Sequence, residues 1–166
     1  MVVGMSLETF TLAHVVLSLV GIASGFIVLF GMIGAKRLDG WAALFLATTV
    51  LTSVTGFFFP VAGFMPSHAV GIISLVFLAA ALVALYVHRL AGSWRWIYVV
   101  GAVAALYLNV FVAVVQAFRK LSFLEPLAPT QSEPPFLVAQ LVVMAIFIVL
   151  GILAVRRFHP GEVAAE

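Results

Sequence analysis

The chain has no cysteine and very few charged residues. Without cysteine, disulfides and thiolate metal sites are excluded. Only 8% of the 166 residues are charged and 65% are hydrophobic, whereas an average soluble domain is about 45–50% apolar and about 25% charged. A soluble fold of this length has too little interior for so much apolar surface, while a lipid bilayer accepts it. The composition therefore predicts an integral membrane protein.

Several catalytic and ligand-binding signatures are missing as well. The sequence has no phosphate-binding Gly-Lys-Ser/Thr loop, no dinucleotide fingerprint and no His-Glu-x-x-His helix. No serine has the neighbours of a nucleophile elbow. The long apolar segments contain no acidic residue, which argues against a proton-coupled pump. The basic residues flank apolar segments instead of clustering on one face, so we expect no nucleic-acid partner.

Five apolar segments follow one another along the chain. Each is close to the ~20 residues with which a helix crosses ~30 Å of hydrocarbon. Because lipid offers no hydrogen-bond partners, the backbone of each segment must pair within itself, which favours helices over open strands. The predicted fold class is all-α, a single membrane domain over residues 1–166. The expected transmembrane helices are Thr9–Ile33, Trp41–Phe59, His68–Val87, Trp96–Phe118 and Phe136–Val155.

The basic residues predict the orientation of the bundle. Cytoplasmic connections carry an excess of Lys and Arg. Six basic residues lie on one predicted side and two on the other, which places the N-terminus outside and the C-terminus in the cytoplasm. Residues 1–10 contain no Lys or Arg, so we expect the first segment to be a retained helix and not a signal peptide. The six are Lys36, Arg37, Arg89, Arg95, Arg156 and Arg157, and the two are Arg119 and Lys120.

Polar side chains from four predicted helices fall in the same, outer leaflet. They are His14, His68, Gln116 and Gln140, and Asn109 lies deeper on the same helix face as Gln116. Polar groups at membrane depth are costly and usually face the bundle interior. These five are candidate cofactor-binding residues. The alternative for the three amides is interhelical hydrogen bonding that only holds the helices together.

The two outer-leaflet histidines, His14 and His68, are the candidate metal ligands. Two imidazoles on facing helices hold a haem iron axially, here as haem b, or contribute to a copper site. Gly71, one turn after His68, would leave room for a flat macrocycle. A quinone-like redox pocket and a purely packing role are the other possibilities. The copper alternative has three further candidate ligands on the same side, Met1, Met5 and Met65.

The longest connection, residues 119–135, contains four prolines and is a second candidate site. Proline restricts its shape before it docks. Thr130, Gln131, Ser132 and Glu133 offer donors and acceptors just above the histidine leaflet. They predict either a binding lid or a rigid cap over the mouth of the bundle.

Some of these residues resemble a group of small, uncharacterised bacterial inner-membrane proteins. The resemblance rests on a pattern that covers nearly the whole chain, namely residues 55–60, 66–68, Asn109–Val112, Gln116, Phe118, 128–136 and Gln140. It implies a multi-pass location in a bacterial inner (plasma) membrane and no particular activity.

Three function classes follow from these features. The first is a binding or redox module that holds haem or a quinone-like molecule near the periplasmic leaflet. The second is a structural or accessory subunit that packs in the bilayer against a larger membrane complex or a second copy of itself. The third is a channel or small-solute carrier that uses Asn109 and a polar stripe, Thr48, Thr49, Thr52, Ser53 and Thr55.

Overall fold

The computed structural model describes residues 2–161, and five long helices make up most of that range. Each of the five is long and apolar enough to cross a membrane, which confirms the predicted all-α class and the five candidate spans. They are α1 (Leu7–Ile33), α2 (Asp39–Thr55), α3 (Pro66–Leu82), α4 (Trp94–Lys120) and α5 (Pro134–Arg157). Two short 3₁₀ turns are η1 (Gly56–Phe58) and η3 (Glu125–Leu127), and α3 continues as the π-helical segment η2 (Val83–Val87). The second and third candidate spans include η1 and η2.

All five helices begin two residues before their predicted starts. Hydropathy marks where the chain enters hydrocarbon, whereas a helix begins at its capping residue, which is often polar and lies outside the apolar run. The Ser6 side chain accepts a hydrogen bond from the Thr9 N–H at 3.2 Å, and Pro66 and Pro134 open α3 and α5. The second helix ends at Thr55 instead of Phe59 because the chain tightens into η1 just before Pro60.

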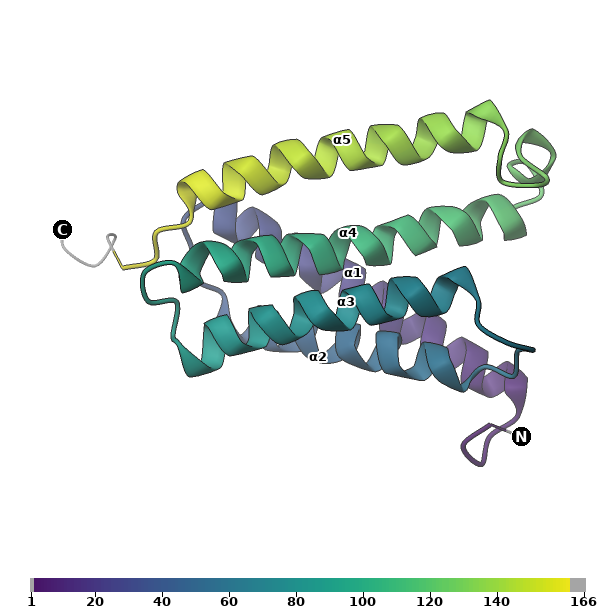
Figure 1. The fold of residues 1–166 in the computed structure, drawn as a ribbon, viewed down its shortest axis with the longest axis horizontal. Helices are drawn as coiled ribbons and strands as arrows, with labels where there is room; N and C mark the ends of the chain where they lie inside the picture. The colour runs from purple at the N-terminus through teal and green to yellow at the C-terminus, as the bar shows by residue number, and fades with distance from the viewer. Residues whose placement is uncertain (1, 162–166) are drawn as a thin grey trace.

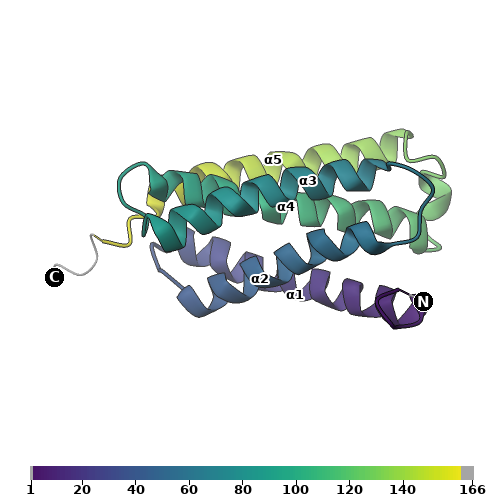
Figure 2. The same cartoon turned by 60° about the horizontal axis from the view of Figure 1, so that its bottom comes forward.

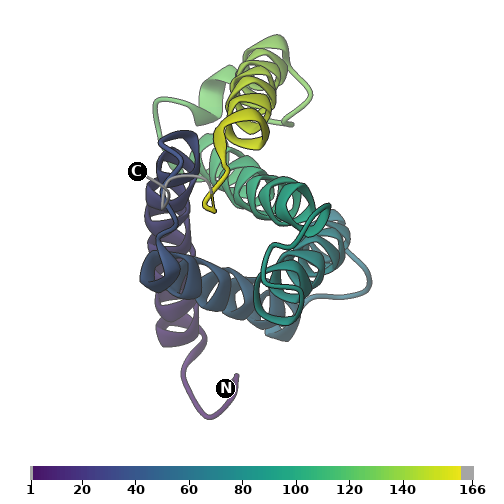
Figure 3. The same ribbon diagram turned by 90° about the vertical axis from the view of Figure 1, so that its left-hand side faces the viewer.

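Consecutive helices run in opposite directions, so the connections gather at two ends of the bundle (Figure 1). We call one the basic end, formed by residues 34–38, 88–93 and 158–161. We call the other the histidine end, formed by residues 2–6, 59–65 and 121–133. Viewed from the basic end, α1 to α4 lie around a common centre and α5 lies outside them, against α4 and α1 (Figure 3). Toward the histidine end, α1 runs away from α5 (Figures 1 and 2).

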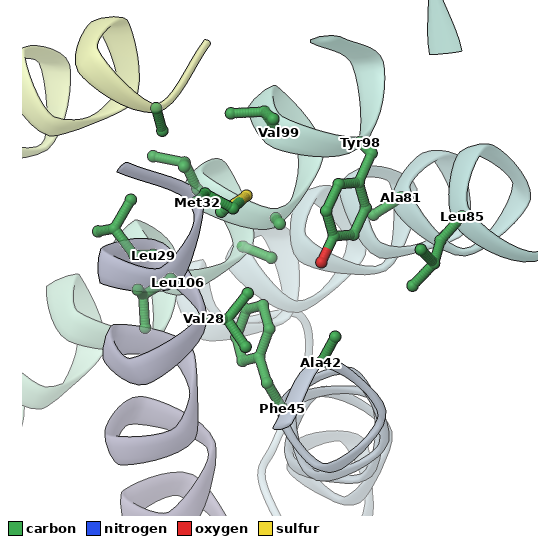
Figure 4. Packing of buried hydrophobic residues seen from close by; sticks show 14 of the residues in the cluster. Val28, Leu29, Met32, Ala42, Phe45, Ala81, Leu85, Tyr98, Val99 and Leu106 are labelled. Carbon is green, nitrogen blue, oxygen red and sulfur yellow. The ribbon is translucent and has the colours of Figure 1, made fainter. Parts of the chain in front are cut away.

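The apolar core occupies only the half of the bundle next to the basic end. Every residue of the buried cluster belongs to that half of its helix or to the connections there. Side chains from four helices meet in it, among them Val28, Phe45, Ala81 and Leu106 (Figure 4). In the other half, Phe10, Phe118 and Ala128 are the buried apolar side chains among residues 2–161.

Two glycines allow the helices of the packed half to approach closely. A Cβ on Gly25 would stand 2.6 Å from Leu106 Cδ1 and 2.9 Å from Phe45 Cε2. A Cβ on Gly101 would stand 2.8 Å from the Phe77 carbonyl oxygen. In lipid, where helices associate through van der Waals contact, such small residues bring the backbones together. These contacts fix α1 on α2 and α4, and α4 on α3.

Candidate functional site

His14 is held by the end of α2. Its Nδ1 lies 2.8 Å from Thr55 Oγ1, and its ring packs edge-on against Phe59, with centroids 5.1 Å apart. The Thr55 hydroxyl donates its one hydrogen to the Leu51 carbonyl at 2.7 Å, so His14 Nδ1 donates to Thr55. In the neutral ring Nε2 then carries the lone pair and can accept a hydrogen bond or ligate a metal.

His68 has the opposite tautomer in its neutral form. Its Nδ1 accepts a hydrogen bond from the Met65 N–H at 3.0 Å, so the side chain caps the start of α3. In the neutral ring the hydrogen is therefore on Nε2, which acts as a donor. The ring stacks on Phe57, with centroids 5.4 Å apart and planes 12° apart. His68 becomes a metal ligand only by losing its capping bond or by changing tautomer.

Aromatic side chains occupy the space around these two rings. Phe59 contacts His14 and Phe57 contacts His68, so both imidazoles lie against the segment that follows α2. A Cβ on Gly71 would stand 3.1 Å from Phe57 Cζ, so the space expected for a macrocycle holds a phenyl ring.

Other metal ligands are sparse at this end. Among residues 2–161, no three His, Asp or Glu side chains lie together as a metal would require. Of the thioethers predicted for a copper site, Met5 and Met65 lie in the non-helical segments before α1 and α3, and Met1 lies outside the described residues.

A polar cluster that the histidines do not share lies at the middle of the bundle. A Cβ on Gly21 of α1 would stand 3.1 Å from Thr49 Oγ1, 3.2 Å from Asn109 Nδ2 and 3.3 Å from Thr48 Oγ1. Two hydroxyls of α2 and an amide of α4 thus converge on a glycine of α1. We call these four residues the Gly21 cluster.

Two atoms of the Gly21 cluster have no hydrogen-bond partner. Thr48 Oγ1 donates to the Leu44 carbonyl at 2.7 Å, but Thr49 Oγ1 and Asn109 Nδ2 are buried and unpaired. The Thr49 residue is only 2% exposed. An unpaired buried polar group costs about 1–3 kcal/mol, and hydrocarbon offers no water in exchange. The cluster therefore contains two buried hydrogen-bonding groups that the described residues leave unsatisfied.

Thr49 and Gly21 were not among the predicted cofactor-binding residues. Two sequence features point to them: the small and polar face His14, Ser18, Gly21, Gly25 on α1, and the threonine stripe on α2. Most hydroxyls of that stripe bond to carbonyls of their own helix, as Thr48, Thr52 and Thr55 do, and Ser53 donates to Ser74 of α3 at 3.2 Å. Thr49 is the member whose hydroxyl has no hydrogen-bond partner among the described residues.

The two glutamines do not join either histidine. Gln140 Nε2 donates to the Phe111 carbonyl at 3.2 Å and links α5 to α4, as the packing alternative predicted. Its Oε1 is buried without a partner. Gln116 lies exposed near the end of α4. The five polar residues predicted as one pocket are thus spread over the histidine end, the α4–α5 contact and the Gly21 cluster.

The predicted lid forms a compact turn that begins α5. The Glu133 carboxylate accepts hydrogen bonds from the N–H and the hydroxyl of Thr130 and from the Ser132 N–H. The Thr130 hydroxyl bond, together with these backbone bonds, holds the pKa of Glu133 below its ordinary value. Gln131, with φ at +61°, donates from Nε2 to the Val115 carbonyl at 3.1 Å. These bonds fasten the turn to α4, which fits a rigid cap.

Comparison with known proteins identifies no relative. No protein family, no curated protein and no solved structure matches the chain. Function has to be inferred from the geometry described above.

Proposed function

We propose that this chain binds a neutral, membrane-soluble carbonyl compound of the quinone class at the Gly21 cluster. The observation that carries the proposal is the pair of buried, unpartnered groups, Thr49 Oγ1 and Asn109 Nδ2, which both lie beside Gly21. Both supply N–H or O–H donors, which suit a carbonyl oxygen. No charged residue belongs to the cluster, which favours a neutral ligand over an ion.

The surroundings of the cluster favour a ligand that arrives from the membrane. Asn109 is half-buried, whereas Thr49 is fully buried. The half of the bundle between the cluster and the histidine end has few buried apolar side chains. A lipid-soluble molecule with one polar head is suited to this combination of apolar walls and a few placed polar groups. His14 lies seven residues before Gly21 on the same helix face, about 10 Å along α1, so it takes no part in holding the same carbonyl.

Binding of a short-chain benzoquinone to the purified protein in detergent tests the proposal. Asn109→Leu removes the donor at similar volume and is expected to weaken saturable binding about tenfold, the value of one hydrogen bond. Gly21→Ala fills the space and is expected to act in the same direction. Gln140→Leu is the matched amide control outside the cluster. Absence of saturable binding, equal loss in Asn109→Leu and Gln140→Leu, or a bound water alone in the cluster would sink the idea.

Haem b is the second candidate, favoured by the arrangement of His14. Histidines that ligate metals usually donate their other ring N–H to a fixed acceptor, as His14 donates to Thr55. His68 would be the second axial ligand after releasing the Met65 N–H. The visible spectrum of purified protein decides between the two candidates. A Soret band lost in both His14→Ala and His68→Ala supports haem, and colourless protein removes it.

We further propose that the chain is a multi-pass protein of a bacterial inner membrane with its N-terminus outside. The charge distribution supports this orientation, because six of the eight Lys and Arg residues lie at or beside the basic end. Reporter fusions test it. A fluorescent reporter at the C-terminus is expected to be active in the cytoplasm, and an alkaline phosphatase fused there is expected to be inactive. The reverse pattern would place the basic end outside.

A further inference from the structure

The basic end contains a cavity that the proposed function does not use. Its volume is about 300 Å³. Arg37 comes from the α1–α2 connection, Arg89 from the α3–α4 connection, Arg95 from the first turn of α4, and His159 from the segment after α5. Four parts of the chain thus bring Arg and His side chains to one space, and none of the described residues that line it is acidic.

Arg95 is a fixed part of the cavity wall. Its Nη1 donates to the Val155 carbonyl at 2.9 Å and to the Phe158 carbonyl at 2.8 Å. These bonds satisfy carbonyls at the end of α5 and hold the following segment against α4. The guanidinium has five N–H donors, so this anchoring leaves others for a ligand.

Arg89 is placed by an unusual backbone. Arg89 has φ of +49° and Leu90 has φ of +62°, in the left-handed region that non-glycine residues rarely adopt. Burial of Leu90 in the core, where it is 8% exposed, holds this turn in place. Consecutive left-handed residues cost free energy and tend to occur where function needs a fixed side chain or turn. The ion pair found among residues 2–161 joins Arg37 to Asp39, so the Arg89 guanidinium has no ion-pair partner in this part of the chain.

We infer that this cavity binds a phosphate group, and that its ordinary source is the headgroup of an anionic phospholipid. Arginine forks match phosphate oxygens in geometry as well as charge. Basic pockets between transmembrane helices at the membrane surface suit anionic lipid headgroups. Trp41 and Trp96 are half-exposed at the starts of α2 and α4 on the same end, which places the cavity at headgroup level. A free phosphate offers the same chemistry without the acyl chains.

The charge of the basic end has a simpler explanation that the test must separate from a site. Lys and Arg at membrane boundaries set topology without binding anything. Arg156 and Arg157 lie exposed at the last turn of α5 and do not line the cavity, so they serve as matched controls.

The experiment titrates full-length protein in non-ionic detergent with phosphatidylglycerol and follows the thermal unfolding midpoint. Wild-type protein is expected to be stabilised saturably by phosphatidylglycerol and not by phosphatidylcholine. The double variant R37Q/R89Q is expected to raise the half-saturating lipid concentration at least about tenfold, the contribution of a hydrogen bond to a charged group. The control R156Q/R157Q is expected to raise it clearly less, because those exposed side chains contribute only the general attraction of a basic surface. Equal losses in the two double variants would leave only a surface potential and overturn the site.

Two further arms assign the occupant. Inorganic phosphate at fixed ionic strength is expected to leave lipid binding unchanged. If inorganic phosphate instead competes with the lipid, and the competition disappears in R89Q, the cavity is a phosphate site whose ligand is soluble phosphate and not a lipid headgroup. The double variant E162Q/E166Q controls for carboxylates of the C-terminal residues. A phosphate effect seen only in that variant would mean that the C-terminal carboxylates compete for the cavity, and it would overturn the proposal.

Discussion

The two halves of this bundle differ in what fills them. The half next to the basic end holds the whole apolar core, with Phe45, Leu78 and Leu106 almost completely buried. The half next to the histidine end holds hydroxyls, amides and imidazoles on helix faces that are mostly half-buried. Because close apolar packing orders side chains, we attribute most of the stability to the first half, and we place the proposed quinone binding at the unpaired polar groups on the border with the second half.

The comparison also separates two kinds of close approach. Gly25 and Gly101 in the packed half face atoms that leave no room for a methyl group. A Cβ on Gly21, at the border of the two halves, would stand 3.1–3.3 Å from three polar side-chain atoms. All three glycines bring helices close together, and they differ in their neighbours, which are polar side chains at Gly21 and mostly apolar or backbone atoms at Gly25 and Gly101.

The largest expected effect is at Gly101. Gly101→Ala places a methyl group 2.8 Å from the Phe77 carbonyl oxygen, a backbone atom that cannot rotate away. We expect the free energy of unfolding in detergent to fall by about 2–3 kcal/mol through overpacking. Gly71→Ala is the matched change in the other half, because its methyl group would be crowded by the end of the Phe57 ring at 3.1 Å and would make only an ordinary contact with the Ser53 carbonyl oxygen at 3.7 Å. We expect a loss below about 1 kcal/mol there. Equal losses would contradict the division into a packed and a looser half.

The second effect concerns the contact of α5 with the rest of the bundle. Arg95→Gln removes the two bonds to the carbonyls of Val155 and Phe158. We expect a loss of about 1.5 kcal/mol, since bonds from charged donors exceed neutral ones. Hydrogen exchange should show faster opening of the last turn of α5. Arg157→Gln, on the same turn but exposed, is expected to change neither quantity.

A smaller effect of opposite sign is expected at Thr49. Thr49→Val removes a buried hydroxyl that has no partner, and we expect ligand-free protein to gain about 1 kcal/mol in stability. Quinone binding should weaken in the same variant. Thr48→Val is the control, because the Thr48 hydroxyl already donates to Leu44. Destabilisation by Thr49→Val without loss of binding would show that the hydroxyl has a structural partner.

The smallest effect is the response of the 128–133 turn to acid. The pKa of Glu133 is depressed by its bonds to Thr130 and Ser132. The stabilisation is therefore fully present above the ordinary value of about 4.5 and is lost as pH falls through the lower, folded value. The protection factors of the Thr130 and Ser132 amides, which are exchange rates relative to the unstructured chain at the same pH, should fall in that range. Glu133→Gln should make these protection factors independent of pH, and a turn equally protected in acid would rule out this role of the carboxylate.

Much of the fold was predictable because hydrocarbon imposes simple rules on sequence. Segments of about twenty apolar residues without acids gave the five candidate spans, and their ends deviated only where caps such as Ser6 and Pro134 lie outside the hydrophobic run. The candidate site was less predictable. His14 and His68 do lie at one end, but Thr55 and Met65 impose opposite tautomers on them, and spacing along the chain contains no information about those partners.

By itself, the sequence determined the number of helices long and apolar enough to span a membrane, their alternation, and which polar residues fall near each end, because these depend on local composition and on the length of each segment. Only the tertiary structure decided that Gly21, Thr49 and Asn109 meet, that Phe57 fills the space beside Gly71, and that Arg37, Arg89 and Arg95 surround one cavity. Those juxtapositions depend on how each helix is rotated about its axis and how closely it approaches its neighbours. The volumes of the side chains at the contacts set the rotation and the distance of each helix, and a hydropathy profile contains no information about those volumes.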